Sequence, residues 1–267
     1  MKPIYYFLFL FLLFHINAVS QDQEEQNVKV NAQLWLDYNF QNDLGDFKTL
    51  NSFVGYRSIT PNIYNNFLVV STYNIANQNS VKFLKREKPF FNSYHFGARA
   101  NYIANKNKKD DFEFRLMQGI KFYLPFIKDV PLMNYIRLEE RFQKTFDTSG
   151  WDIGFRFRYK ISTVLDLDKH LFNFTTGFYI PMNVEFFFNL KKVDRFNDVI
   201  RISPGIGYKL NEDWKFEFYV SYQNTQNTSQ TENTSNDFVF RLRIFKLSSK
   251  KNKTIQSKDE QIKELIE

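Results

Sequence analysis

Residues Trp151–Thr163, which read WDIGFRFRYKIST, alternate strictly between two kinds of side chain. Every second residue from Trp151 to Ile161 is apolar or aromatic, and each residue between is polar, small or cationic. A period of two over this length is typical of a β-strand with one face in an apolar medium and the other in water. Similar segments fill most of the chain. The pattern therefore predicts an all-β fold, a closed, antiparallel, up-and-down transmembrane β-barrel.

The chain begins with a pattern for export. Lys2 precedes an apolar run from Ile4 to Ile16, and the small residues of Ala18-Val19-Ser20 follow it. This order is typical of a secretory signal peptide, here residues 1–20, removed from the mature protein. An N-terminal membrane anchor is the weaker alternative, because a spanning helix needs about 20 apolar residues. We therefore expect an exported protein of the cell outer membrane in a Gram-negative bacterium.

Composition supports this class and excludes others. Aromatic residues make up 19% of the 267 residues, and there is no cysteine, which excludes disulfides and thiolate metal sites. The net charge of +7 could indicate a nucleic-acid partner, but the cations lie at alternating strand positions and in turns, with no basic helix. We therefore expect no nucleic acid as a partner. A mean hydropathy of −0.45 is compatible with a barrel, since only alternate residues face lipid.

The number of strands depends on one proline. The alternating segments are 30–40, 47–57, 64–76, 90–103, 111–123, 132–146, 151–163, 171–190, 197–210, 214–224 and 237–245. Pro181 interrupts the eighth, and because proline cannot donate to a sheet ladder, a turn there gives twelve strands and a continuous strand gives eleven. Bacterial single-chain barrels have even numbers, so we expect about 12 strands, with 10 as the fallback. The barrel would span 30–245, between a periplasmic segment 21–29 and a charged, disordered periplasmic tail 246–267.

A count of twelve strands would also decide at which end of the barrel each connection lies. The polar connections Asn77–Pro89 and Thr225–Asn236 would both be outer loops, and the short turns at 147–149 and 211–213 would both be periplasmic. Trp151 and Trp214 would begin strands at the periplasmic rim, where amphipathic aromatic residues are favoured.

Charged residues gather on the inward face of neighbouring strands. Pairing around the turn at 147–149 should place Glu139 near Arg156, and pairing of the two preceding strands should place Glu113 near Arg141. Cations outnumber carboxylates, so this wall should carry a positive potential that attracts anions. The alternative is a salt-bridged interior that fills a narrow barrel and conducts nothing. We call these residues the lumen-charge cluster: Arg99, Glu113, Arg115, Arg137, Glu139, Arg141, Arg156, Arg158 and Lys160.

Candidate catalytic residues are few. His95 is predicted to face inward near Ser93, and His170 lies in a connection beside Asp166 and Asp168. Either could serve a hydrolase, but a polar lumen residue and a solvated turn explain the same residues more simply. There is no zinc signature and no glycine-rich phosphate loop. We therefore expect no catalytic residue, metal or cofactor, and we interpret the glycines of Gly205-Ile206-Gly207 as a bend or bulge.

Several strand sequences resemble an uncharacterised domain-of-unknown-function family of Gram-negative outer-membrane proteins. They are Glu113–Gln118, Arg137–Arg141, Arg156–Tyr159, and Arg201 followed by Gly205–Tyr208. The resemblance covers about Ala32 to Phe245 and implies an outer-membrane barrel with no established activity. It transfers no catalytic residue.

Two functions of different classes fit these observations. The first is a passive channel or small porin that prefers small anionic solutes, acting as a monomer among outer-membrane lipid and lipopolysaccharide. The second is a sealed structural or surface-interaction barrel that acts through its outer loops. A barrel-embedded hydrolase is a third possibility. A soluble lipocalin-like barrel would need apolar residues inside and polar ones outside, which the alternation argues against.

Overall fold

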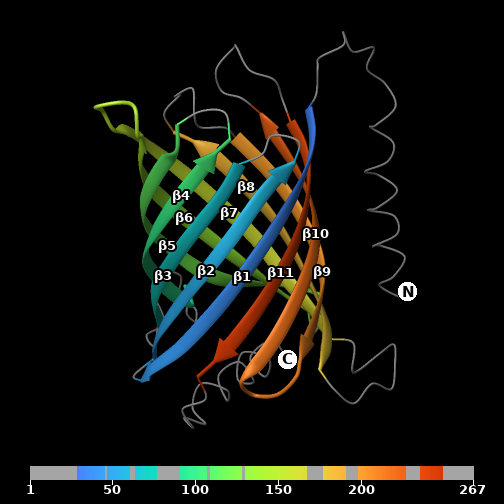
Figure 1. Cartoon of the computed structure of the whole chain (residues 1–267). Coiled ribbons are helices and arrows are strands. Elements are labelled where there is room, and N and C mark those ends of the chain that lie inside the picture. The colour runs from blue at the N-terminus through green and yellow to red at the C-terminus, as the bar shows by residue number, and fades with distance from the viewer. Residues whose placement is uncertain are drawn as a thin grey trace.

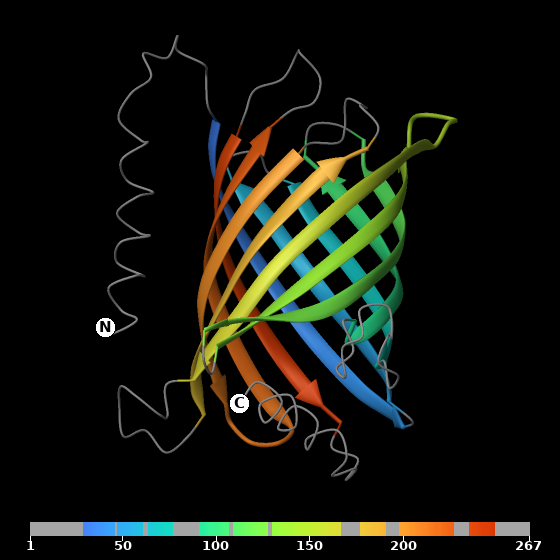
Figure 2. The same ribbon diagram turned by 180° about the vertical axis from the view of Figure 1, so that it is seen from behind.

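The structure, a computed structural model, describes residues 29–45, 47–60, 64–76, 91–106, 109–127, 130–166, 177–190, 198–226 and 235–248. These residues form one closed β-barrel (Figures 1 and 2). Its strands are β1 (Lys29–Gly45), β2 (Lys48–Thr60), β3 (Tyr64–Ala76), β4 (Ser93–Asn105), β5 (Asp111–Ile127), β6 (Val130–Thr145), β7 (Asp152–Asp166), β8 (Phe178–Asn189), β9 (Asp198–Lys209), β10 (Trp214–Gln226) and β11 (Ser235–Leu247). The predicted all-β barrel is therefore confirmed.

The strand count of twelve, and the fallback of ten, are wrong: the described residues form eleven strands. Pro181 lies inside β8 and pairs with Val164 of β7, so no turn divides this segment. Pairing of β8 with β9 lapses only locally, between Tyr179–Gly207 and Met182–Pro204, and resumes in the same register. The missing N–H of proline thus interrupts the hydrogen bonds between β8 and β9 locally, but the chain does not turn back.

An odd number of strands changes how the barrel closes. Neighbours along the chain pair antiparallel, but β1 pairs with β11 in parallel, with Ala32 opposite Phe238 and Leu36 opposite Leu242. In Figure 1, β1 starts at the upper end of the barrel and β11 finishes at the lower end. The chain therefore enters and leaves the barrel at opposite ends.

The odd number of strands also shows that two expectations are wrong: the two short turns do not lie at one end of the barrel, and neither do the two rim tryptophans. The turn between β6 and β7 and the turn between β9 and β10 lie at opposite ends of the barrel, and so do the last residues of β3 and β10. Trp151, just before β7, and Trp214, at the start of β10, therefore mark two different rims.

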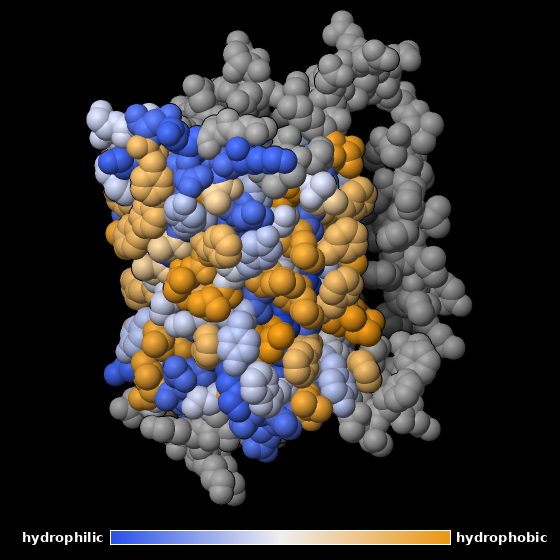
Figure 3. Space-filling model, in the orientation of Figure 1, coloured by the Kyte–Doolittle hydropathy of each residue, from blue (hydrophilic) through white to orange (hydrophobic). Residues whose placement is uncertain are grey.

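The barrel is polar inside and apolar outside. Most of its buried side chains are polar or charged, among them Asn101, Glu113 and Glu139. Large apolar side chains are instead exposed on the outer surface, such as Phe67 and Phe155. Figure 3 shows hydrophobic residues over the middle of the visible face and strongly hydrophilic ones near both ends. A lipocalin-like barrel has the opposite arrangement, so the structure excludes that alternative.

Several expectations fall on segments that lie outside the described residues. These are the signal peptide over 1–20, most of the segment 21–29, and all but the start of the tail 246–267. Among the residues that the structure describes, no helix is both long and apolar enough to cross a membrane.

Candidate functional site: a cation-lined lumen

The lumen-charge cluster comes together as the sequence predicts. Its side chains project into the barrel from β4, β5, β6 and β7, because each lies on the inward phase of its strand. Glu139 is fully buried and accepts hydrogen bonds from Arg115 (Nη1 to Oε2, 3.2 Å), Arg156 (Nη2 to Oε2, 2.5 Å) and Arg137. The predicted proximity of Glu139 and Arg156 is thus confirmed.

Glu113 organises the neighbouring part of the cluster. Its Oε2 accepts from Arg115 Nη2 at 2.7 Å, and its Oε1 accepts from Arg141 Nε at 2.5 Å, as predicted. Asn101 of β4 also donates to Glu113, and Arg99 donates from Nε to Asn101 Oδ1 at 2.7 Å. Two carboxylates therefore hold most of the cluster in place.

A second charged network adjoins the first. It joins Arg158 and Lys160 of the lumen-charge cluster to residues on β8 and β9 that were not among the predicted site residues. Glu185 of β8 pairs with Arg158, with Arg201 of β9 (Nη1 to Oε2, 2.9 Å) and with Lys160 (3.8 Å). Farther round the barrel, β11 contributes two more inward arginines. Arg241 pairs with Asp37 of β1, and Arg243 pairs with Glu217 of β10 at 3.0 Å. The signal was available, since these arginines alternate with apolar residues, but only barrel closure brings them to the same space.

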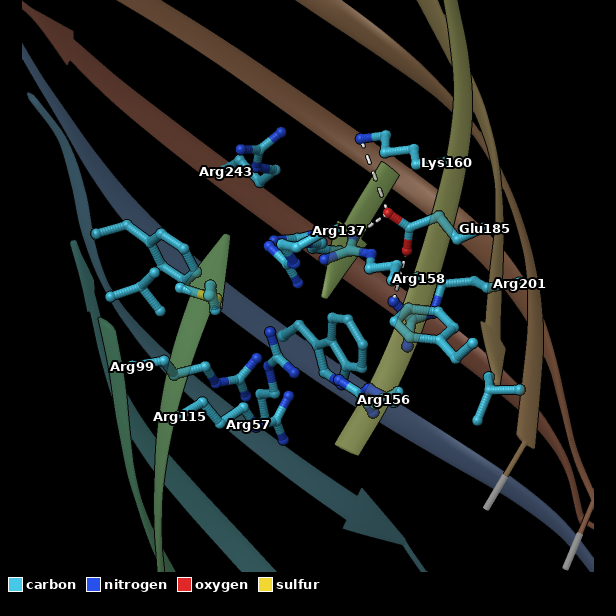
Figure 4. Close-up of a pocket in the computed structure, with 17 residues that line it drawn as sticks. Arg57, Arg99, Arg115, Arg137, Arg156, Arg158, Lys160, Glu185, Arg201 and Arg243 are labelled. Carbon is cyan, nitrogen blue, oxygen red and sulfur yellow. Dashed lines mark hydrogen bonds and ion pairs between the residues drawn. The ribbon is translucent and has the colours of Figure 1, made fainter. Parts of the chain in front are cut away.

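Both networks line a cavity of about 230 Å³ inside the barrel (Figure 4). Figure 4 shows Arg57, Arg99, Arg115 and Arg156 gathered on one side and Lys160, Arg158, Arg201 and Glu185 on the other. Apart from Glu185, the charged lining is entirely cationic: Arg57, Arg99, Arg115, Arg137, Arg156, Arg158, Lys160, Arg201, Arg241 and Arg243. The uncharged part of the lining is Trp35, Phe53, Val70, Met117, Phe187 and Val199.

Two aromatic rings, those of Trp35 and Phe187, are part of the cavity lining and contact the same arginine. Arg201 places its guanidinium carbon 4.6 Å from the ring centroid of Trp35 on β1 and 5.1 Å from that of Phe187 on β8. These rings belong to strands that β9, β10 and β11 separate in the sheet. The Trp35–Arg201–Phe187 bridge therefore links side chains of β1, β9 and β8 across part of the interior. Trp35 is fixed there, because its indole N–H donates to Gln33 Oε1 at 2.9 Å.

The side chains of Ser93 and His95, predicted to lie near each other, are in direct contact. The two residues share a hydrogen bond between Ser93 Oγ and His95 Nε2 at 2.7 Å, and the imidazole packs against the ring of Tyr135. Among the described residues, however, no carboxylate is hydrogen-bonded to His95, so the third member of a Ser-His-acid site is not found there. His170 lies outside the described residues. The described part of the chain also contains no cluster of residues suited to hold a metal ion.

Comparison with known proteins gives a family. A family model described as "Protein of unknown function (DUF2490)" matches residues 32–235. The chain belongs to the DUF2490 family. This confirms the resemblance to an uncharacterised domain-of-unknown-function family. No curated protein and no solved structure matches the chain.

The DUF2490 match extends from β1 to the start of β11. It contains the whole lumen-charge cluster and also Trp35, Arg57, Glu185 and Arg201. Arg241 and Arg243 follow the matched region, although they line the same cavity. The DUF2490 region therefore holds most of the candidate site.

Proposed function

We propose that this protein is a passive channel of the outer membrane whose cationic lumen favours small anions. The observation that carries the proposal is the excess of cations at the cavity. Nine arginines and Lys160 line it, and they pair with only five carboxylates: Glu185 in the lining, and Asp37, Glu113, Glu139 and Glu217 beside it. Charge of one sign in a low-dielectric cylinder focuses the electric field and concentrates counter-ions. The barrel would act as a monomer, with membrane lipid and lipopolysaccharide around it and no catalytic role.

The membrane location is supported by the outer surface. Side chains such as Phe96, Ile153 and Phe240 are between 41% and 51% exposed and belong to an apolar surface around the barrel. Soluble monomers rarely expose apolar patches beyond a few hundred Å², whereas a bilayer would cover this band. The expected signal peptide over 1–20 would supply the export that such a location requires.

One observation favours the sealed-barrel alternative. The Trp35–Arg201–Phe187 bridge reaches across part of the lumen at the level of the cavity, and Arg201 is further held by Glu185 and by Gln223 (Nη2 to Oε1, 2.7 Å). A lumen closed here would leave a barrel that acts only through its connections. Because β3 and β10 end at opposite ends of the barrel, the two connections that follow them start from opposite rims.

Reconstitution in a planar bilayer under a potassium chloride gradient tests the channel. We expect ion conductance with a reversal potential of the sign that chloride selectivity gives. The variant Arg201→Ala, which removes the guanidinium between the two rings, should raise the single-channel conductance. A folded protein that conducts no ions, with or without this substitution, would support the sealed barrel, and cation selectivity would reject the proposed channel.

A further inference from the structure

Two of the cations that line the cavity have no carboxylate partner. Eight of the ten lie within 4.0 Å of an Asp or Glu oxygen. Arg57 and Arg99 are the exceptions among the described residues. Arg57 lies over the Trp35 ring at 3.9 Å, and Arg99 donates only to the neutral amide of Asn101. Enclosed charges are costly unless they are paired, so these two guanidinium groups call for a counter-ion from outside the chain.

Unused hydrogen-bond donors point to the same conclusion. The Nε atoms of Arg57, Arg137, Arg158 and Arg243 are buried and have no hydrogen-bond partner among the described residues. All four arginines line the cavity. A buried polar atom without a partner normally marks a water, ion or ligand that satisfies it. The cavity therefore offers directional donors as well as positive charge.

The donor type and the available space restrict the ligand. A guanidinium group presents a planar fork of N–H donors that matches the oxygen atoms of phosphate or carboxylate, whereas a halide has no matching geometry. Two unpaired cations favour an anion with two charges over a monocarboxylate. At about 230 Å³, the cavity is smaller than the ~300–1,000 Å³ of typical pockets for drug-sized ligands. A compact inorganic oxyanion fits both conditions.

We propose that the side of the cavity formed by Arg57, Arg99, Arg115 and Arg156 (Figure 4) is a binding site for a small tetrahedral oxyanion of the phosphate class. Arg57 and Arg99 supply the charge that no ion pair balances among the described residues. Arg115 and Arg156 are held in position by Glu139 and frame the site. The inference rests on the proposed function in using the same lumen, to which it adds a preferred solute.

Isothermal titration of the refolded full chain in detergent, at constant ionic strength, tests the site with inorganic phosphate, sulfate, acetate and chloride. We expect phosphate and sulfate to bind more tightly than acetate and chloride. The double variant Arg57→Gln/Arg99→Gln should weaken phosphate binding by about tenfold or more, because it removes charge-assisted hydrogen bonds. Lys144→Gln removes one positive charge from the outer face of β6 and should change the affinity less than about twofold.

Two further variants keep the test decisive if the double variant does not fold, which a heat-shift gel reveals. Arg99→Lys keeps the charge but loses the planar fork and should bind phosphate with intermediate affinity. Arg57→Gln alone should also weaken binding. Equal affinity for phosphate and chloride, or undiminished phosphate binding in these variants, would overturn the proposed site. Phosphate binding without conductance would refute only the channel, and anion conductance without phosphate binding would refute only this site.

Discussion

Glu139 and Glu140 are adjacent residues with opposite surroundings. Glu139 points into the lumen, has no exposed surface and contacts three arginines. Glu140 lies on the outer face of β6, opposite Leu116 of β5 and Phe155 of β7, and its carboxylate forms no hydrogen bond or ion pair with another described residue. The Glu139 carboxylate thus balances the charge of its arginine neighbours, whereas the Glu140 carboxylate lies in an apolar band.

We expect the same substitution to have different effects at these two positions. Glu139→Gln leaves buried guanidinium groups without their charge partner and should lower the free energy of unfolding by about 3–5 kcal/mol. Glu140→Gln removes a charge from the apolar band and should change that free energy by less than about 1 kcal/mol, or raise it slightly. Urea unfolding in lipid vesicles measures both. A larger loss for Glu140→Gln would contradict the assignment of faces.

Local sequence was sufficient for one half of the site and not for the other. Glu139 and Arg156 lie on strands joined by a short turn, so alternation and turn position together predict their register. Arg201 and Arg241 meet Trp35 only because the first and last strands pair when the barrel closes. No local pattern encodes that closure, and the network on β8 to β11 therefore escaped prediction.

At the scale of single strands, the pairing of β9 excludes a bulge at Gly205-Ile206-Gly207, which was one of the two interpretations of these glycines. The register of β9 with β8 and with β10 is the same on both sides of Gly205 and Gly207, so there is no bulge, although Gly205 lies where the pairing with β8 lapses. Both glycines instead make room for tyrosine rings inside the barrel. A Cβ at Gly205 would lie 2.6 Å from the Tyr219 ring, and one at Gly207 would overlap the Tyr179 ring.

Substitution of Gly207 tests this role. Gly207→Ala should push the Tyr179 ring away from the strand and break the hydrogen bond from its hydroxyl to Glu217, which is 2.9 Å long. Overpacking of this kind costs about 1–3 kcal/mol. Gly150→Ala is the matched control, because a Cβ at Gly150 meets nothing within 4 Å. Comparison of their thermal unfolding should show a loss for Gly207→Ala alone, and equal midpoints would refute the packing role.

At the scale of the whole molecule, the even-number rule misled the strand count. Each alternating segment corresponds to one strand, including the segment around Pro181, and a literal count of segments gives eleven. The rule describes how known bacterial barrels close, while the ladder of β1 with β11 closes this one in parallel. The sequence contains no local signal for the pairing of strands about 200 positions apart, such as that of Gln33 with Val239.

For a barrel that spans the outer membrane, as we propose, the odd count predicts which turns lie on the same side of that membrane. The chain has no cysteine, so Gly150→Cys, between β6 and β7, and Glu212→Cys, between β9 and β10, each introduce a single thiol. On intact cells a membrane-impermeant maleimide should label only one of the two variants. After cell disruption it should label both. Labelling of both thiols on intact cells, or of neither, would instead fit an even-stranded barrel.

The central claim is that apolar side chains face lipid while arginines face the lumen, and a cysteine series along β7 tests it most directly. Phe155→Cys, Arg156→Cys, Phe157→Cys and Arg158→Cys would each carry a fluorophore in vesicles that contain a lipid-bound quencher. The alternation of β7 predicts strong quenching at 155 and 157 and weak quenching at 156 and 158. Equal quenching at the four positions, or the reverse alternation, would contradict the claim.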